Sequence, residues 1–96
     1  MGKAKKKNTL EQVMRALGDP IRLSVVRQLL KAEGQEMACG SFEYSVTKAT
    51  FSHHLKILRE AGITESRQEG TKKLTSLRLR ELEAEFPGLL KLLARA

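Results

Sequence analysis

Cysteine, aromatic residues and long apolar runs are scarce in this sequence. Its 96 residues include one cysteine, Cys39, no tryptophan, one tyrosine and three phenylalanines. A single cysteine cannot form an internal disulfide and does not provide Cys-x-x-Cys spacing, which excludes a disulfide framework and a zinc finger. No run approaches the roughly 18 apolar residues of a membrane span, and the basic N-terminus lacks the apolar segment of a secretory signal. We therefore expect a cytoplasmic protein with no membrane association, metal site or cofactor.

Negative charge is also in short supply. The chain has 18 Lys and Arg against 11 Asp and Glu, a net charge of +7, which indicates a polyanionic partner. An anionic membrane surface would require a basic amphipathic helix with aromatic anchors, and none is present, so nucleic acid is favoured. A chain this short buries only about 60 to 65% of its unfolded surface and supports one core. We expect a basic disordered tail over residues 1–8, with a phosphate-binding arm as the alternative, and one domain over residues 9–96.

Helix signals begin directly after the tail. Thr9 starts a capping-box pattern, and apolar residues at helical spacing predict a helix to about Leu17. Asp19 is a good N-cap and Pro20 favours the first helical position, so a second helix is expected to about Ala32.

The second helix and the segment after it raise two questions. Arg22 lies within the apolar arc of the helix, where it needs a carboxylate or carbonyl partner; a phosphate contact is the alternative. Residues 33–46 are irregular. They suggest a short strand over residues 37–39 and one or two helical turns over residues 41–45.

The next helix has a cationic face. Thr47 is a good N-cap, and residues 48–61 predict a helix that ends at Gly62. At 100° per residue one side carries Phe51, Leu55 and similar packing residues. The opposite side carries the polar and small residues Lys48, Ala49, Ser52, His53, Lys56, Arg59 and Glu60. Such a face suits insertion into a major groove, where donors read purine acceptors and Lys and Arg neutralise phosphates.

A β-hairpin is expected directly after this helix, with strands over residues 63–67 and 72–79 and a polar turn between them. Arg67, Lys72 and Lys73 lie near its tip. A hairpin in this place can reach the sugar-phosphate backbone or minor groove while the helix occupies the major groove.

The two adjacent histidines point about 100° apart on a helix and are poorly placed to bind one ion. His53 lies at the edge of the polar face and is assigned to DNA. His54 faces the packed side and is assigned a hydrogen-bonded structural role.

Three stretches, residues 16–23 (ALGDPIRL), 51–63 (FSHHLKILREAGI) and the Glu69-Gly70 turn, resemble the ArsR/SmtB family of bacterial repressors. The resemblance covers nearly the whole chain after Thr9. It implies a mainly α winged helix-turn-helix fold of about five helices and a two-stranded wing. It also implies a homodimer, joined by the first and last helices, that represses by blocking promoter access. Its expected DNA-contacting residues are Thr47, Lys48, Ala49, Thr50, Ser52, His53, Lys56, Arg59, Arg67, Lys72 and Lys73.

The chain departs from the family's metal sensors. They carry a Cys-x-Cys box near the helix before the recognition helix, or Asp and His ligands on the last helix. This chain has only Cys39 and no His there, so metal sensing is not expected. The helix preceding Thr47 also looks short, with Gly40 interrupting it. Cys39 is interpreted as a buried structural thiol, with a redox sensor as the alternative.

The two ends of the chain carry more apolar surface than a small core needs, which predicts a homodimer interface. Intramolecular pairing of the terminal helices is the alternative. The predicted interface residues are Leu10, Val13, Met14, Leu17, Leu89, Leu90 and Leu93. Two recognition helices related by a two-fold axis would read an inverted-repeat operator in double-stranded DNA.

Other functions fit the sequence less well. A winged-helix module that binds a protein partner or structured RNA remains the alternative to a DNA-binding repressor. No arrangement of nucleophile and base, phosphate-binding glycine loop or paired carboxylates indicates an enzyme. A small-molecule or redox effector is compatible with the sequence, which does not identify it.

Overall fold

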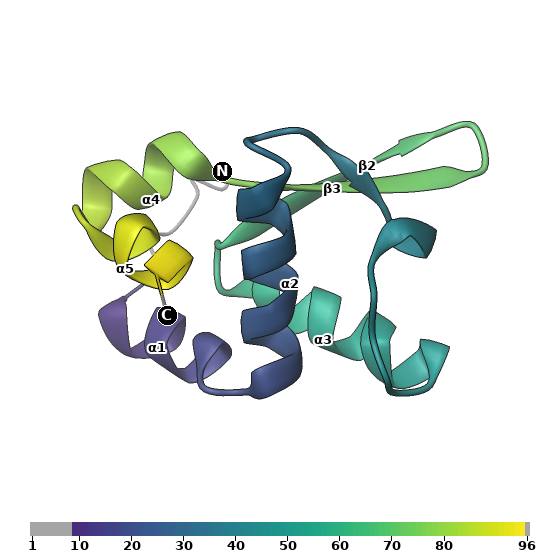
Figure 1. Cartoon of the computed structure of the whole chain (residues 1–96), viewed down its shortest axis with the longest axis horizontal. Helices are drawn as coiled ribbons and strands as arrows, with labels where there is room; N and C mark the ends of the chain where they lie inside the picture. Colours follow the sequence, from purple (N-terminus) through teal and green to yellow (C-terminus); the bar gives the residue numbers. More distant parts are fainter. Residues whose placement is uncertain (1–8, 96) are drawn as a thin grey trace, which may run out of the picture.

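The computed structural model describes residues 9–95, which form five α-helices and a small antiparallel sheet whose hairpin projects from one end of the molecule (Figure 1). The predicted tail, residues 1–8, lies outside the described residues. In chain order the elements are α1 (Leu10–Leu17), α2 (Pro20–Lys31), β1 (Met37–Ala38), the 3₁₀ turn η1 (Cys39–Ser41), α3 (Lys48–Glu60), β2 (Thr64–Glu69), β3 (Lys72–Leu77), α4 (Leu79–Glu85) and α5 (Leu89–Arg95).

The first two helices begin where their capping residues predict. The Thr9 hydroxyl accepts from the Gln12 amide at 3.2 Å, and the Gln12 side chain accepts from the Thr9 amide at 3.0 Å, which completes a capping box. Asp19 caps α2 by accepting from the amides of Ile21 and Arg22 at 2.8 and 3.2 Å.

Helix α3 begins at Lys48, as predicted, and ends at Glu60, one residue before the predicted end. The Thr47 hydroxyl accepts from the Thr50 amide at 3.1 Å. At the other end Gly62 has a φ of 78°, and the Ile63 amide donates to the Leu58 carbonyl at 3.1 Å. A left-handed glycine with this bond ends the helix and turns the chain into β2.

The sheet is larger than the predicted two-stranded wing. Its order is β1-β3-β2, and β1 pairs with β3 through Met37 and Ala38. The hairpin turn is shorter than expected, since Glu69 already pairs with Lys72. Gly70, with a φ of 63°, occupies the first central position, as in the two-residue turns that match the twist of a hairpin.

The segment before α3 differs from prediction. The strand at Met37–Ala38 is present. The one helical feature after it is the 3₁₀ turn Cys39–Ser41, and residues 42–45 are not helical. A side chain supplies the missing backbone partners, because Gln28 both donates to the Glu43 carbonyl and accepts from its amide, each at 2.9 Å. Tyr44 stacks on Phe51 with ring centroids 3.9 Å apart. Contacts with Gln28 of α2 and Phe51 of α3 therefore hold this segment, and they take the place of the hydrogen bonds that a helix would form within it.

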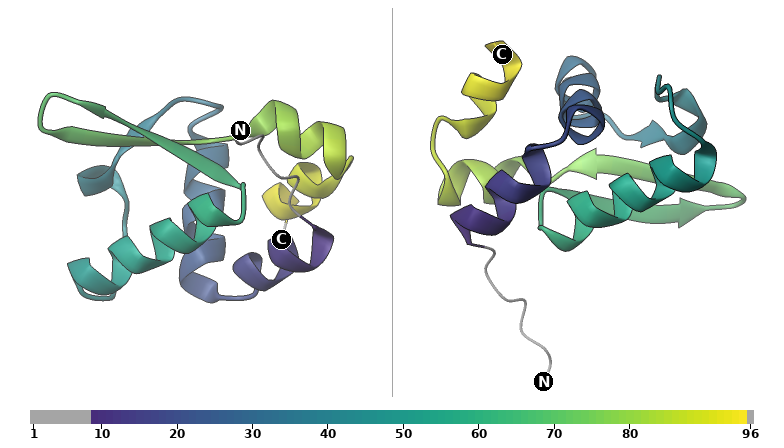
Figure 2. Two further views of the ribbon diagram at one scale, coloured as in Figure 1. Left: turned by 180° about the vertical axis from the view of Figure 1, so that it is seen from behind. Right: turned by 90° about the horizontal axis from the view of Figure 1, so that it is seen from below.

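The C-terminal part forms two short helices after the hairpin. The second strand was expected to reach Leu79, but it ends at Leu77 and Leu79 begins α4. Pro87 and Gly88, the latter with a φ of 90°, separate α4 from α5. Helices α1, α4 and α5 gather at one end of the molecule, opposite the hairpin tip (Figures 1 and 2).

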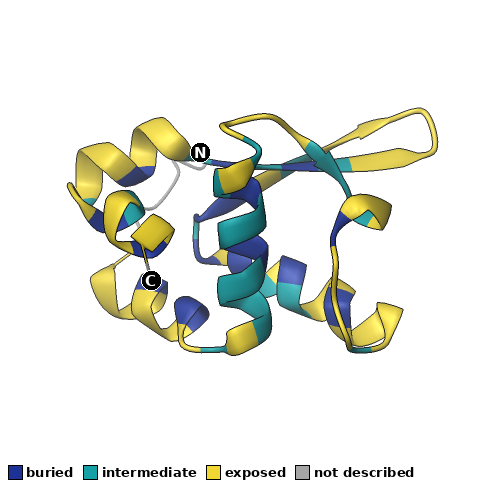
Figure 3. Cartoon of the chain, viewed as in Figure 1, coloured by how far each residue is buried: buried dark blue, intermediate teal, exposed yellow. Residues whose placement is uncertain are grey.

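The core lies around α2, as the buried residues in Figure 3 show. It joins Val25, Val26 and Leu29 of α2 to Leu55 and Leu58 of α3 and to residues of every other helix. Because the inner sides of α2 and α3 pack against each other, the opposite side of α3 faces outward. Within residues 9–95 no helix is long and apolar enough to cross a membrane.

Candidate nucleic-acid interface

The polar face of α3 is open to solvent. Phe51, Leu55 and Leu58 are 2%, 7% and 0% exposed and anchor the helix on the core. Seven of the predicted contact residues are exposed: Thr47, Lys48, Ala49, Thr50, Ser52, His53 and Lys56. Arg59, near the C-terminal end, is half-buried. The helix therefore presents two lysines and several hydroxyl groups with no protein covering them.

The hairpin places two more lysines close to α3. Lys72 and Lys73 are exposed at the start of β3, and they line a cavity of about 590 Å³ together with Lys48 of α3. Cys39, Tyr44 and Phe51 also line this cavity. We call it the helix–wing cavity. It brings residues of the predicted recognition helix and of the predicted wing to one concave surface.

Arg67, a predicted phosphate contact, is engaged by carboxylates of the protein itself. Its guanidinium donates to both carboxylate oxygens of Glu36, at 2.7 and 2.9 Å, and to Glu69 at 3.3 Å. The hydrogen bond from Arg67 holds the pKa of Glu36 below its ordinary value, and the same bond raises the pKa of Arg67. Arg67 therefore ties the wing to the segment before β1, and its charge is already neutralised.

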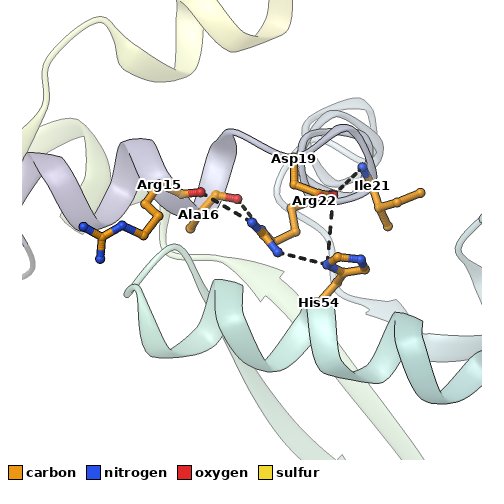
Figure 4. Close-up of polar contacts among 6 residues, drawn as sticks. All are labelled: Arg15, Ala16, Asp19, Ile21, Arg22 and His54. Atoms are coloured by element: carbon orange, nitrogen blue, oxygen red, sulfur yellow. Dashed lines mark hydrogen bonds and ion pairs between the residues drawn. The ribbon is translucent and has the colours of Figure 1, made fainter.

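A polar network between α3 and the junction of α1 and α2 fixes the position of α3 (Figure 4). Arg22 donates through Nε to the Ala16 carbonyl at 2.6 Å, and its Nη1 lies 3.1 Å from His54 Nδ1. A guanidinium only donates, so His54 accepts this bond through Nδ1. The predictions of a carbonyl partner for Arg22 and of a hydrogen-bonded structural role for His54 are confirmed.

Asp19 completes this network. Its Oδ1 lies 4.0 Å from His54 Nδ1. Burial alone would raise the pKa of Asp19. The hydrogen bonds from the Arg22 and Ile21 amides and the nearby positive charge of Arg22 outweigh that effect and hold the pKa of Asp19 below its ordinary value. The junction of α1 and α2 is thus bonded to α3 on the side of the helix opposite its exposed face.

The residues predicted for a dimer interface separate into two groups. Leu10 and Met14 are 52% and 46% exposed, and Leu92, another apolar residue of the C-terminal segment, is 62% exposed. Leu90 is half-buried. As a correction, four predicted interface residues are buried in the chain's own core: Val13, Leu17, Leu89 and Leu93. The inner sides of α1 and α5 face α2 within one chain, which leaves only their outer sides for a second copy.

Cys39 begins η1, where it is half-buried with a free thiol. Within residues 9–95 no group of three or more His, Cys, Asp or Glu side chains is arranged to hold a metal ion.

Sequence reasoning missed three residues that shape the interface. Gln28 holds Glu43, Tyr44 stacks on Phe51, and Glu36 pairs with Arg67. Two of these contacts join residues that are distant along the chain, and Tyr44 and Phe51 are seven positions apart. No local sequence pattern predicts any of the three contacts.

Comparisons with known proteins agree with this geometry. Residues 17–67 match the model of a helix-turn-helix domain family. An HTH-type transcriptional regulator of Bacillus subtilis, YceK, is 38% identical over 84 residues, which cover 85% of this chain and 83% of that protein. An HTH-type transcriptional regulator of Methanocaldococcus jannaschii is 41% identical over 62% of this chain and 67% of its own length.

Solved structures share the fold. HlyU from Vibrio cholerae superposes with a TM-score of 0.71 at 24% identity, covering 88% of this chain and 87% of that one. The transcriptional repressor BigR from Xylella fastidiosa superposes with a TM-score of 0.64 at 26% identity, covering 80% and 85%. An ArsR family transcriptional regulator also matches, with a TM-score of 0.70 at 18% identity, covering 86% and 90%. The matched domain, the relatives and the hairpin beside α3 lead to one conclusion: the chain belongs to the helix-turn-helix family of DNA-binding transcriptional regulators and has the winged fold seen in ArsR-type members.

Proposed function

We propose that this protein is a homodimeric transcriptional repressor that binds an inverted-repeat operator, with α3 in the major groove and the wing, residues 64–77, on the adjacent backbone or minor groove. The observation that carries the proposal is the exposure of Lys48, Ser52 and Lys56 on α3, where Lys48 and Ser52 share a cavity with the wing lysines. These side chains supply the donors and positive charge that a duplex groove requires. The name of BigR, a repressor with the same fold, supports repression over activation.

The proposed contact residues are revised in one respect. Arg67 is assigned to holding the wing, because two carboxylates already bind it. The proposed DNA contacts are Thr47, Lys48, Ala49, Thr50, Ser52, His53, Lys56, Arg59, Lys72 and Lys73.

Dimerisation is proposed through the outer sides of α1 and α5. Leu10, Met14 and Leu92 are large apolar side chains left exposed at the same end of the molecule. Apolar side chains grouped in this way typically mark an interface, and a two-fold contact of this patch with itself would close the assembly. The half-buried Leu90 would lie at the edge of this interface.

Selection of bound fragments from genomic DNA tests the proposal. The expected result is a roughly palindromic site, bound by two chains, that overlaps a promoter whose transcription falls when the protein is added. About six phosphate contacts would weaken binding roughly a thousandfold between about 50 and about 200 mM salt. Failure to enrich any duplex, together with capture of a structured RNA or a protein, would refute the proposal in favour of the other winged-helix function.

A further inference from the structure

The helix–wing cavity has the size and chemistry of a small-molecule site. Its volume of about 590 Å³ falls within the roughly 300 to 1,000 Å³ of typical ligand pockets. Phe51 is buried, Cys39 is half-buried, and Tyr44 is stacked on Phe51 at an interplanar angle of 7°. These three side chains provide an apolar wall that is held in place by the core.

The charge of the cavity is of one sign. Lys48, Lys72 and Lys73 line it, and no acidic residue does. None of the three lysines has an ion-pair partner among the residues that the structure describes. The hydroxyl groups of Ser52 and Thr71 add hydrogen-bonding capacity. An apolar wall beside unneutralised ammonium groups suits a ligand that has a flat apolar body and one anionic group.

We propose that the helix–wing cavity binds a small aromatic carboxylate, and that this ligand and DNA exclude each other. The second part rests on the proposed function. Lys48 and Ser52 belong to the DNA-facing side of α3, and Lys72 and Lys73 belong to the wing. A carboxylate bound to these groups occupies the donors that DNA phosphates would use, and its ring fills the space between helix and wing. The cavity therefore acts as an inducer site.

Binding is tested first without DNA, with 2-naphthoate as the probe and the uncharged 2-naphthalenemethanol as its control. Chemical-shift changes in amide spectra are expected to concentrate at residues 38–52 and 71–73. Because Cys39 is the chain's single cysteine and lines the cavity, 2-naphthoate should also slow its alkylation by N-ethylmaleimide. The uncharged analogue should do neither at the same concentration.

Two lysine variants make the test specific. Lys48→Gln should weaken binding of 2-naphthoate about fivefold, the effect of losing one exposed ionic contact. Lys91→Gln removes the same charge from α5, at the far end of the molecule, and should leave the affinity unchanged. Shift changes scattered over the surface, an unaltered alkylation rate, or equal effects of the two variants would overturn the site.

Exclusion of DNA is tested separately. With the cavity affinity known, the apparent Kd for operator DNA should rise with ligand as simple competition requires, about elevenfold at ten times the ligand Kd. Unchanged DNA affinity at saturating 2-naphthoate would overturn the exclusion. A protein that binds 2-naphthoate in the cavity but binds no DNA at any salt concentration would refute the proposed function and the exclusion with it, while supporting the site.

Discussion

Removing one wing lysine should change the salt dependence of DNA binding by a predictable amount. Four lysines on the proposed interface are exposed and have no ion-pair partner among the described residues: Lys48, Lys56, Lys72 and Lys73. Each is expected to displace about one condensed cation from a phosphate, which contributes about 0.9 to the slope of log K against log salt. Lys73, paired with Gln68 across the hairpin, carries no acidic cross-strand neighbour.

The change Lys73→Gln removes one contact from each protomer, hence two from the proposed dimer. The slope should become shallower by about 1.8, and at about 150 mM salt the association constant should fall roughly 30-fold. A monomeric complex would lose only about 0.9, so the size of the change also reports how many chains bind.

Fluorescence anisotropy of a labelled operator, titrated at four or more salt concentrations, measures both quantities. Arg67→Gln is the matched control, because it removes the same charge from the same hairpin at a site already paired with Glu36. It should leave the slope nearly unchanged. Equal slope changes for Lys73→Gln and Arg67→Gln would refute the reasoning, since only the overall net charge would then matter.

Three further predictions concern the scaffold. Asp19→Ala should lower the free energy of unfolding by about 1 kcal/mol through loss of the α2 cap. The folded-state pKa of Asp19 is held below 3.8. The stability advantage of the wild type over Asp19→Asn should therefore be present above pH 3.8 and vanish as the pH falls through the folded-state pKa. Denaturant titrations at neutral and at acidic pH measure this difference in stability, and a difference that does not change with pH would contradict the prediction. Met14→Glu should yield a folded protein that sediments as a monomer, and a dimer of this variant would place the interface elsewhere. Val13→Ala, in the core, should instead lower the free energy of unfolding by about 2 kcal/mol. Gly70→Ala should lower the free energy of unfolding by about 1 kcal/mol, because Gly70 has a φ of 63°, and should loosen the wing. Thermal unfolding and DNA affinity measure these two effects. Unchanged values of both would exclude strain at this turn.

The helices were predictable where their limits depend on local chemistry. Thr9, Asp19 and Thr47 each accept amide protons within three residues of their own position, so the sequence alone locates those helix starts. The exposed and buried sides of α3 were likewise predictable from its 100° periodicity, whereas the winged helix-turn-helix fold was expected from the resemblance to the ArsR/SmtB family.

Residues 39–46 were not predictable in the same way. The Gln28 side chain holds the backbone of Glu43, and the ring of Tyr44 stacks on Phe51. No pattern of neighbouring residues in the sequence predicts these contacts. The division of α1 and α5 into a side packed on the core and a side left exposed has a similar origin. Periodicity marks an apolar stripe, but it does not say whether the same chain or a second copy covers it.

By itself, the sequence determined the caps, the apolar stripes, the excess of positive charge and the cationic side of α3, because each depends on residues a few positions apart. Only the tertiary structure decided that Arg67 is bound by Glu36, that Val13 belongs to the core while Met14 does not, and that three lysines from two elements share one cavity. These outcomes depend on which distant segments meet. That is a property of the packed chain, in which a charge is free or neutralised according to the neighbour that the fold supplies.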